Sequence, residues 1–237
     1  MVYNYFMDKI LNKLKNNIIV SLQAMPDEPL YDENCIIAMA KSIVELGGAT
    51  ALRLAGERDI KNIKKLFPNV VVIGITKPEK IPTNYKELVY ITPSVKDCKK
   101  IIDAGADIVA FDGTTRDRGN KETVKDLIDF IHSQNKIAMA DIADFAQAQN
   151  AFNLGADIVS TTLSGYTKET QNKPNTPDFE LVKEIKEKLD IFTILEGKIW
   201  EQKEAQTAFE IGADSVAIGS AITRPQLITK RFLEVIK

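Results

Sequence analysis

Two charged side chains, Lys77 and Glu196, stand at the ends of uninterrupted apolar runs in the sequence. The runs Val70 to Thr76 and Ile191 to Glu196 are too short for helices and are typical of buried parallel strands. In parallel α/β folds the carboxyl ends of the strands form one edge, where catalytic residues gather. A lysine and a glutamate facing each other there suit removal of a proton next to a carbonyl and return of a proton from the other side. We therefore predict that Lys77 and Glu196 are catalytic.

This chemistry requires shifted pKa values. Lys77 needs a lowered pKa to act as a base, which burial and a nearby cation such as Arg53 would produce. Glu196 needs a raised pKa to donate a proton. Further polar residues are expected at the same edge. Each has either a functional role beside Lys77 and Glu196 or a structural role in which it bonds to neighbouring loops, and for Asp112 and Asp141 these two roles stay equal alternatives. These strand-end residues are Gln23, Arg53, Asp112, Asp141, Thr161, Thr162, Gly219 and Ser220.

Glycines after the last two predicted strands indicate a phosphate site. Backbone N–H groups that glycine exposes, with a helix start behind them, bind anions well. The segment after Ser220 supports this prediction, because Thr223 can cap a helix, Pro225 suits its first turn and Arg224 can reach an anion with two donors. The final helix is expected to pack Leu227, Ile228, Phe232 and Val235 against the core. The predicted phosphate ligands are Gly197, Lys198, Gly219, Ser220 and Arg224.

An internal repeat predicts the architecture that positions these residues. The chain has GADIVA from Gly105, GADIVS from Gly155, GADSVA from Gly212 and a looser GATALR from Gly48, at separations of 57, 50 and 57 residues. Each copy follows a helical pattern, so its glycine is expected to end a helix before a strand begins. One more strand fits before each copy, which gives eight in all. We predict a single-domain (β/α)8 TIM barrel over residues 18–237, with residues 1–17 as a helix closing its bottom. A doubly wound open sheet is the alternative, but no GxGxxG turn follows the first strand.

Two connections need separate treatment. Leu88 to Thr92 is predicted to be an excursion within a long loop rather than a ninth strand, with Ser94 capping the helix that follows. The polar stretch Ser164 to Pro177 is long for a loop, so either a lid over the mouth or a disordered surface loop fits it.

Bulk properties exclude several classes of protein. The 237 residues carry a formal net charge of -2, which argues against a nucleic-acid binder. No apolar stretch approaches the ~20 residues of a membrane helix, although residues 1–17 leave a membrane-surface helix as an alternative. Cys35 and Cys98 fall in predicted helices without metal-type partners, so a reducing cytoplasm is expected. The only histidine, His132, lies far from the mouth, which argues against a catalytic metal, and neither metal nor cofactor is predicted.

From Val20 onward several short sequence pieces belong together. They are Gln23 with Glu28-Pro29-Leu30, Arg53, GITK ending at Lys77, MADI around Asp141, TTLSGYT from Thr161, Glu196-Gly197, and GSAITRPQLITKRF from Gly219. In these pieces the chain resembles the N-acetylmannosamine-6-phosphate 2-epimerase family. The resemblance implies a cofactor-independent enzyme that interconverts N-acetylmannosamine 6-phosphate and N-acetylglucosamine 6-phosphate in amino-sugar and sialic acid catabolism. It implies Lys77 and Glu196 as the proton-transferring pair, Gln23, Arg53, Asp141 and Thr161 at the sugar, and the five phosphate ligands named above. The chain departs from the family pattern at Lys198, Ala55 and Pro78.

Two other functions stay open at this point. A desolvated lysine at a barrel mouth also suits an aldolase or lyase in which Lys77 forms a Schiff base. A non-catalytic sugar-phosphate-binding barrel would keep the anion site without the chemistry. The expected partner is a small amino-sugar phosphate, and a homodimer is the alternative to a monomer.

Overall fold

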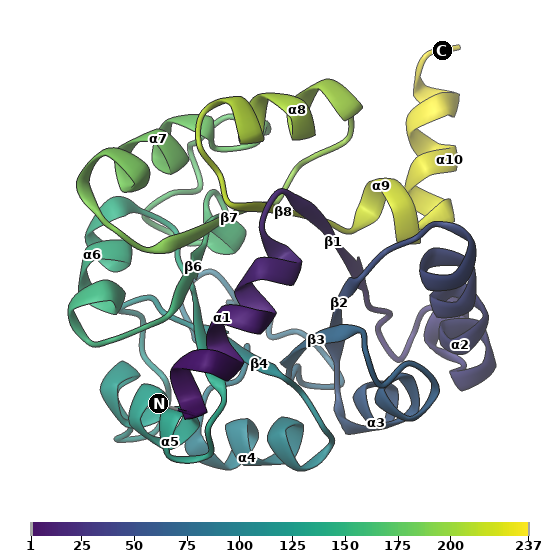
Figure 1. Ribbon diagram of the computed structural model, residues 1–237. Coiled ribbons are helices and arrows are strands. Elements are labelled where there is room, and N and C mark those ends of the chain that lie inside the picture. Colours follow the sequence, from purple (N-terminus) through teal and green to yellow (C-terminus); the bar gives the residue numbers. More distant parts are fainter. Residues whose placement is uncertain (1, 237) are drawn as a thin grey trace.

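The computed structural model describes residues 2–236 and shows a closed barrel (Figure 1). Within these residues eight parallel strands pair in chain order, and β8 closes the sheet on β1 through pairs such as Ile18 with Val216. The predicted (β/α)8 barrel is thus confirmed, and the open doubly wound sheet is wrong because the sheet has no edge. The strands are β1 (Asn17–Leu22), β2 (Ala51–Ala55), β3 (Val71–Ile75), β4 (Ile108–Asp112), β5 (Ile137–Asp141), β6 (Ile158–Ser160), β7 (Phe192–Glu196) and β8 (Ser215–Ile218).

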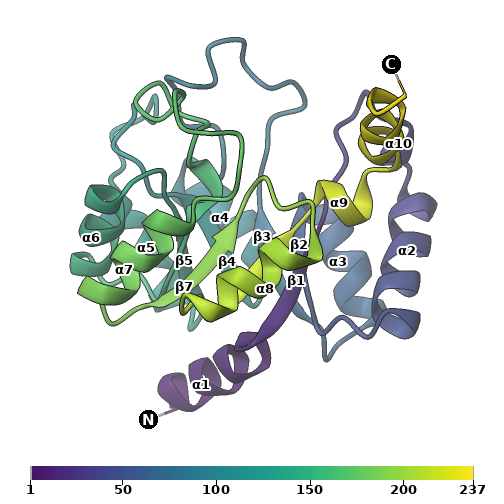
Figure 2. The same ribbon diagram turned by 90° about the horizontal axis from the view of Figure 1, so that it is seen from above.

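Alternate side chains of each strand fill the barrel or face the surrounding helices. On β3, Val71 and Ile73 belong to the inner apolar cluster, whereas Val72 belongs to the outer one. Seven helices from α2 to α8 ring the sheet, as Figures 1 and 2 show. The helices are α1 (Val2–Leu14), α2 (Glu33–Lys41), α3 (Glu57–Leu66), α4 (Val95–Asp103), α5 (Val124–Ser133), α6 (Phe145–Asn153), α7 (Phe179–Lys188), α8 (Gln202–Glu210), α9 (Ser220–Thr223) and α10 (Pro225–Glu234).

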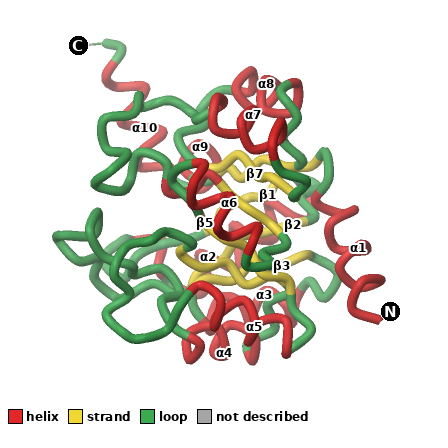
Figure 3. The backbone as a smooth tube through the Cα atoms, turned by 90° about the vertical axis from the view of Figure 1, so that its left-hand side faces the viewer, coloured by secondary structure: helices red, strands yellow, loops and turns green. Residues whose placement is uncertain are grey.

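Helix α1 lies on the side of the barrel opposite the long loops (Figure 3). Its buried Ile10 and Leu14 join the inner apolar cluster. These contacts place apolar side chains of the N-terminal helix against the lower end of the barrel interior, at the amino ends of the strands. No helix of residues 2–236 has the length and apolar character needed to cross a membrane.

The glycines of the three GAD repeats end helices as predicted, with φ of 107° at Gly105, 96° at Gly155 and 99° at Gly212. The aspartates have a role that the sequence did not reveal. Asp214 Oδ2 accepts hydrogen bonds from the Thr193 amide at 2.8 Å and from Lys186 Nζ at 2.8 Å, so it ties the start of β7 to the start of β8. In each copy of the repeat, the aspartate thus joins the start of its own strand to the start of the preceding strand. The other two sets are Asp107 with Val72 N and Lys64, and Asp157 with Ala138 N and His132.

Removing one of these ties should destabilise the barrel measurably. Asp214→Ala leaves the Thr193 amide without its acceptor and Lys186 without its carboxylate, and we expect a loss of about 2 kcal/mol in the free energy of unfolding. Asp214→Asn should lose less, since its amide oxygen still accepts from Thr193. Urea unfolding of both variants, with the exposed Asp190→Ala as control, measures this. An equal loss in both variants would assign the effect to the ion pair instead.

The connection from β3 to α4 contains no ninth strand, which confirms the predicted excursion. Leu88 makes one isolated bridge with Asp117, and Ile91 turns back into the inner cluster. The Ser94 hydroxyl accepts the Asp97 amide at 3.1 Å and caps α4, as predicted. This excursion and the loop after β6 extend from the end of the barrel opposite α1, as their colours along the sequence show in Figure 2.

The expected packing of the last helix is wrong. No residue of α10 is buried, and Phe232 and Val235 keep 73% and 82% of their surface exposed. Helix α10 begins at Pro225, directly after the short α9, and points away from the barrel (Figures 1 and 2). The apolar residues of this segment do recur at helical spacing, but they do not pack against the core of this chain.

Candidate active site

A cavity of about 540 Å³ opens at the carboxyl ends of the strands. Lys77 after β3 and Glu196 at the end of β7 both line it, so the two residues predicted to do chemistry share one pocket. Ile75, Ile91 and Ala217 of the inner cluster contribute apolar surface beneath them. The other lining residues are Ser21, Gln23, Arg53, Thr162, Tyr166, Asn175, Gly197, Lys198, Ile199, Trp200, Ile218, Gly219, Ser220, Thr223, Arg224 and Leu227.

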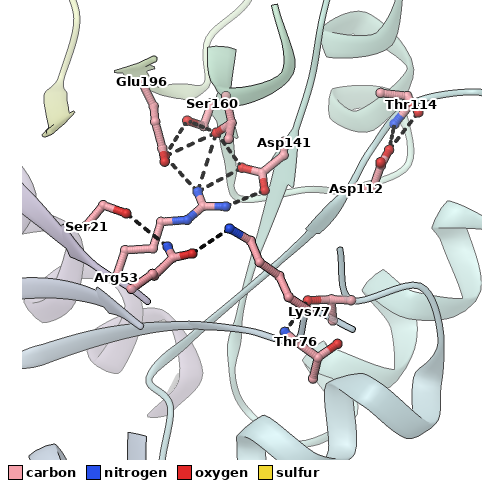
Figure 4. Close-up of polar contacts among 12 residues, drawn as sticks. Ser21, Arg53, Thr76, Lys77, Asp112, Thr114, Asp141, Ser160 and Glu196 are labelled. Carbon is pink, nitrogen blue, oxygen red and sulfur yellow. Dashed lines mark hydrogen bonds and ion pairs between the residues drawn. The ribbon is translucent and has the colours of Figure 1, made fainter. Parts of the chain in front are cut away.

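Arg53 occupies the centre of the polar network (Figure 4). Its side chain is only 1% exposed and makes a two-point ion pair with Asp141, Nη1 to Oδ1 at 3.0 Å and Nη2 to Oδ2 at 2.5 Å. Nη1 also donates to Glu196 Oε2 at 2.7 Å. Burial alone would lower the pKa of Arg53, but the Asp141 and Glu196 carboxylates raise it above its ordinary value. The pocket therefore contains a fixed positive charge next to Glu196.

Lys77 points toward the same region and is held by Gln23. Its Nζ donates to Gln23 Oε1 at 2.8 Å, while Gln23 Nε2 donates to Ser21 Oγ at 2.9 Å. Burial lowers the pKa of Lys77 to about 8, and Arg53 adds to this while Glu196 opposes it. Because this pKa is near neutrality, the amine can both accept and release a proton under physiological conditions.

Glu196 ends β7 with a carboxylate whose two oxygens differ. Arg53 Nη1, Thr162 Oγ1 at 3.1 Å and Ser160 Oγ at 3.4 Å all contact Oε2. Among residues 2–236, every hydrogen bond to this carboxylate ends on Oε2, which leaves Oε1 available to a ligand. Burial raises the pKa of Glu196, while the charge of Arg53 opposes the rise. Glu196 and Lys77 are thus shifted toward each other, as proton exchange with one substrate requires.

The structure does not bring Thr161 to the pocket. Its hydroxyl accepts from the Glu196 amide at 3.0 Å and donates to the Glu196 carbonyl at 3.0 Å, so it joins η3 (Thr161–Leu163) to β7. Thr162 lines the cavity in its place. The sequence analysis named Thr161 as the substrate-binding threonine, whereas the structure places Thr162 on the pocket, because β6 stops at Ser160 and the chain turns at once into a 3-10 helix.

Asp141 and Asp112 do not line the pocket either. Asp141 is fully buried beneath Arg53, and its contact with a sugar, implied by the family resemblance, is replaced by the ion pair. Asp112 is equally buried and binds Arg116, the Thr114 amide at 3.0 Å and the Thr114 hydroxyl at 2.6 Å, apart from the main network (Figure 4). Of the two alternatives for these aspartates, the geometry supports the structural one, in which each carboxylate holds a neighbouring arginine.

All five predicted phosphate ligands line the pocket, on the loops after β7 and β8. Gly197 and Lys198 have φ of 108° and 62°, so the loop turns sharply in the left-handed region. Lys198 Nζ donates to the Pro174 carbonyl at 2.9 Å and lies 5.6 Å from the centre of the Tyr166 ring, toward the loop after β6. Arg224 forms an ion pair with Glu28. Each of the two cationic side chains is therefore held by another part of the chain.

The predicted cap at Thr223 is wrong, because Arg224 holds the cap position of α10. The Thr223 hydroxyl instead donates to the Ser21 carbonyl at 2.9 Å and so ties α9 to β1. Tyr166 and Asn175 of the loop after β6 line the pocket, which favours the lid over the surface loop among the two alternatives for Ser164 to Pro177. Among residues 2–236 no group of three histidine, cysteine, aspartate or glutamate residues is arranged to hold a metal ion.

Comparisons with known proteins agree on one family. A family profile described as "Putative N-acetylmannosamine-6-phosphate epimerase" matches residues 36–237. A Clostridium perfringens protein named "Putative N-acetylmannosamine-6-phosphate 2-epimerase" is 42% identical over 229 residues, covering 96% of this chain and 100% of the relative. A protein of the same name from Caldanaerobacter subterraneus subsp. tengcongensis is 42% identical over 230 residues, covering 96% of this chain and 94% of the relative.

Solved structures lead to the same group. The N-acetylmannosamine-6-phosphate 2-epimerase from Clostridium perfringens superimposes with a TM-score of 0.89 at 41% identity, covering 95% of this chain and 96% of that chain. The 3-hexulose-6-phosphate synthase from Salmonella typhimurium, at 18% identity and a TM-score of 0.62, covers 89% of this chain and 92% of that chain. At that identity only the barrel fold is shared.

Proposed function

Because this chain belongs to the N-acetylmannosamine-6-phosphate epimerase family, we propose that it interconverts N-acetylmannosamine 6-phosphate and N-acetylglucosamine 6-phosphate. It is an isomerase of amino-sugar phosphates, and its reaction inverts C2. The observation that supports this activity best is the placement of Lys77 and Glu196 on one pocket, from strands β3 and β7. Two groups with pKa values shifted toward each other can serve opposite faces of a single carbon.

In the proposed mechanism the sugar reacts in its open-chain form, in which the C1 carbonyl makes the C2 proton acidic. One member of the pair removes this proton, and the electrons of the C–H bond move into a planar enolate. The other member then delivers a proton to the opposite face of C2. Arg53 lies beside Glu196 and supplies positive charge where negative charge develops on the intermediate.

The remaining residues bind and orient the substrate. Gln23 holds Lys77 and faces the sugar hydroxyls, whereas Asp141 acts through Arg53. The loops after β7 and β8 hold the phosphate with the backbone amides of Gly197, Lys198, Gly219 and Ser220, and Arg224 approaches it from the junction of α9 and α10. Lys198 contributes its backbone rather than its amine, because Nζ is engaged with Pro174.

Incorporation of solvent deuterium tests this function directly. When purified enzyme acts on N-acetylmannosamine 6-phosphate in D2O, both epimers should acquire deuterium at C2, detected by loss of the C2 proton signal in NMR. Conversion without exchange at C2 would refute proton abstraction at that carbon. No conversion and no exchange would favour the non-catalytic sugar-phosphate-binding barrel.

The pH dependence follows from the paired groups. The Lys77 ammonium with a Glu196 carboxylate, and neutral Lys77 with a Glu196 carboxylic acid, hold the same number of protons, so both directions share one profile. Above the lowered pKa of Lys77, about 8, the pair loses its last proton. We expect kcat/KM to fall in both directions as the pH rises through that value. Initial rates at neutral and alkaline pH measure this, and a rate that keeps rising would show that a single neutral lysine suffices.

We also propose that the chain pairs with a second copy through α10. Phe232, Val235 and Ile236 expose between 73% and 82% of their surface, which is costly for a lone chain in water. Sedimentation velocity should show a dimer, and Phe232→Asp should shift the protein toward the monomer. A monomeric wild-type protein would contradict this pairing.

We propose a cytoplasmic location because neither cysteine forms a disulfide. Cys35 and Cys98 are both free thiols, as expected in a reducing compartment. Labelling of the folded and the unfolded protein with a thiol reagent should count both cysteines as reduced.

A further inference from the structure

The Thr162 hydroxyl lies between two carboxylates that have different tasks. Its Oγ1 is 2.7 Å from Asp141 Oδ1 and 3.1 Å from Glu196 Oε2, and Ser160 Oγ is 2.9 Å away. A hydroxyl carries one proton, so Thr162 can donate to only one of the two carboxylates at a time. The contacts therefore describe two alternative hydrogen bonds rather than one fixed network.

The two carboxylates compete unequally as the reaction proceeds. Asp141 receives both terminal nitrogens of Arg53, which fix its two oxygens beside the Thr162 hydroxyl as acceptors. Glu196 gains and loses the substrate proton, for which Oε1 is available. An ionised Glu196 is a strong acceptor at Oε2, whereas a protonated Glu196 is a weak one. The preferred acceptor of the Thr162 proton should change with the state of Glu196.

We propose that Thr162 is a positioning residue whose hydroxyl turns from Glu196 to Asp141 when Glu196 takes up the substrate proton, and turns back when Glu196 releases it. This inference rests on the proposed epimerase function, because it assigns Glu196 two protonation states in each cycle. The Thr162 hydroxyl donates to Glu196 and stabilises it when Glu196 is ionised, and it donates to Asp141 when Glu196 is protonated. In each state the proton of the half-buried Thr162 hydroxyl therefore has a carboxylate acceptor.

The surroundings allow this rotation without backbone movement. Thr161 ties η3 to the backbone of Glu196, so the Thr162 side chain stays at a fixed distance from the carboxylate. Ser160 can donate to the Thr162 oxygen in either orientation. The charged and titratable groups that face Glu196 from the neighbouring elements are Arg53, Asp141, Lys77 and Tyr166. A substitution at Thr162 leaves all four residues in place, and the direct ion pairs of Arg53 with Asp141 and Glu196 do not pass through Thr162.

The decisive comparison is Thr162→Val, which keeps the shape but removes the hydroxyl, against Thr162→Ser, which keeps the hydroxyl. In a carbon-13 NMR titration of the glutamate carboxyl groups, the Glu196 signal is assigned by its absence from Glu196→Gln. Thr162→Val should raise the pKa of Glu196 by about one unit, the scale of one lost hydrogen bond to a charged group. The kcat of Thr162→Val should fall about tenfold, and the acidic limb of its pH profile should move to higher pH by the same amount as the pKa of Glu196. Thr162→Ser should stay within about twofold of the wild type.

An unchanged Glu196 titration in Thr162→Val would overturn the proposal, because a merely structural threonine would affect stability and not the carboxyl group. If Thr162→Val does not fold, Thr162→Ala replaces it in the same titration. The titration needs no turnover, so it separates the two hypotheses. If the wild-type enzyme does not exchange the C2 proton, the proposed epimerase function is refuted. The titration would still show whether the Thr162 hydroxyl donates to Glu196, because it does not depend on turnover.

Discussion

Replacing Lys77 by methionine is expected to lower kcat for epimerisation by at least about 10²-fold, the range for loss of a general acid or base. Methionine keeps the length and much of the volume of lysine but cannot carry a proton. The loss should appear in both directions, since the amine removes the proton in one and returns it in the other. Initial rates with each epimer measure it, and near-normal turnover would exclude Lys77 from the chemistry.

The matched control for this substitution is Lys80→Met, three residues further along the same connection. Lys80 is exposed and does not line the pocket, so its replacement should leave kcat within about twofold of the wild type. Gln23 loses its partner in Lys77→Met, and a modest rise in KM is expected from this side effect. The large effect should be on kcat.

Lys77 also allows a test of the competing Schiff-base chemistry. A lysine with its pKa lowered to about 8 is nucleophilic enough to attack a carbonyl. Borohydride reduces a Schiff base irreversibly, so treatment in the presence of substrate would attach the sugar to Lys77 if the enzyme were a lyase. We expect mass spectrometry to find Lys77 unmodified in the wild-type protein.

The residues at strand ends were predictable because one rule of the fold positions them. In a parallel barrel the residues at the carboxyl ends of the strands, or just after them, reach the same mouth, so Lys77 and Glu196 could be placed together from the apolar runs that precede them. Arg53 joins them from the middle of β2. The GAD repeat gave the number of strands for a similar reason. Its glycines end helices through backbone conformation, which depends on the local sequence.

Features that depend on tertiary contacts were not predictable in this way. The choice between Thr161 and Thr162 depends on β6 stopping after three residues. The partners of Lys198 and Arg224, Pro174 and Glu28, lie 24 and 196 positions away in the sequence. Apolar spacing in the last helix indicates that one face will be covered, but not whether the same chain covers it. Long-range pairing decides each of these points.

Glu196→Gln is the second substitution with a large expected effect, again at least about 10²-fold in kcat for epimerisation. Glutamine matches the shape of the carboxyl group and can still accept from Thr162, but it cannot exchange a proton with the substrate. Glu180→Gln, at an exposed glutamate outside the pocket, is the control and should behave like the wild type. Retained epimerisation in Glu196→Gln would leave Lys77 as a single base serving both faces.

The two variants together should reveal which face of C2 each residue serves. Glu196 raises the pKa of Lys77, so removing its charge leaves more of the amine neutral near pH 7. Glu196→Gln should therefore still exchange the C2 proton of the epimer whose proton faces Lys77, without converting it. Lys77→Met should exchange only the other epimer, through Glu196. Incubating each of the two sugar phosphates in D2O with each of the two variants gives four NMR measurements in all. Exchange of opposite epimers would assign one base to each face, whereas exchange of the same epimer by both variants would contradict a two-base mechanism.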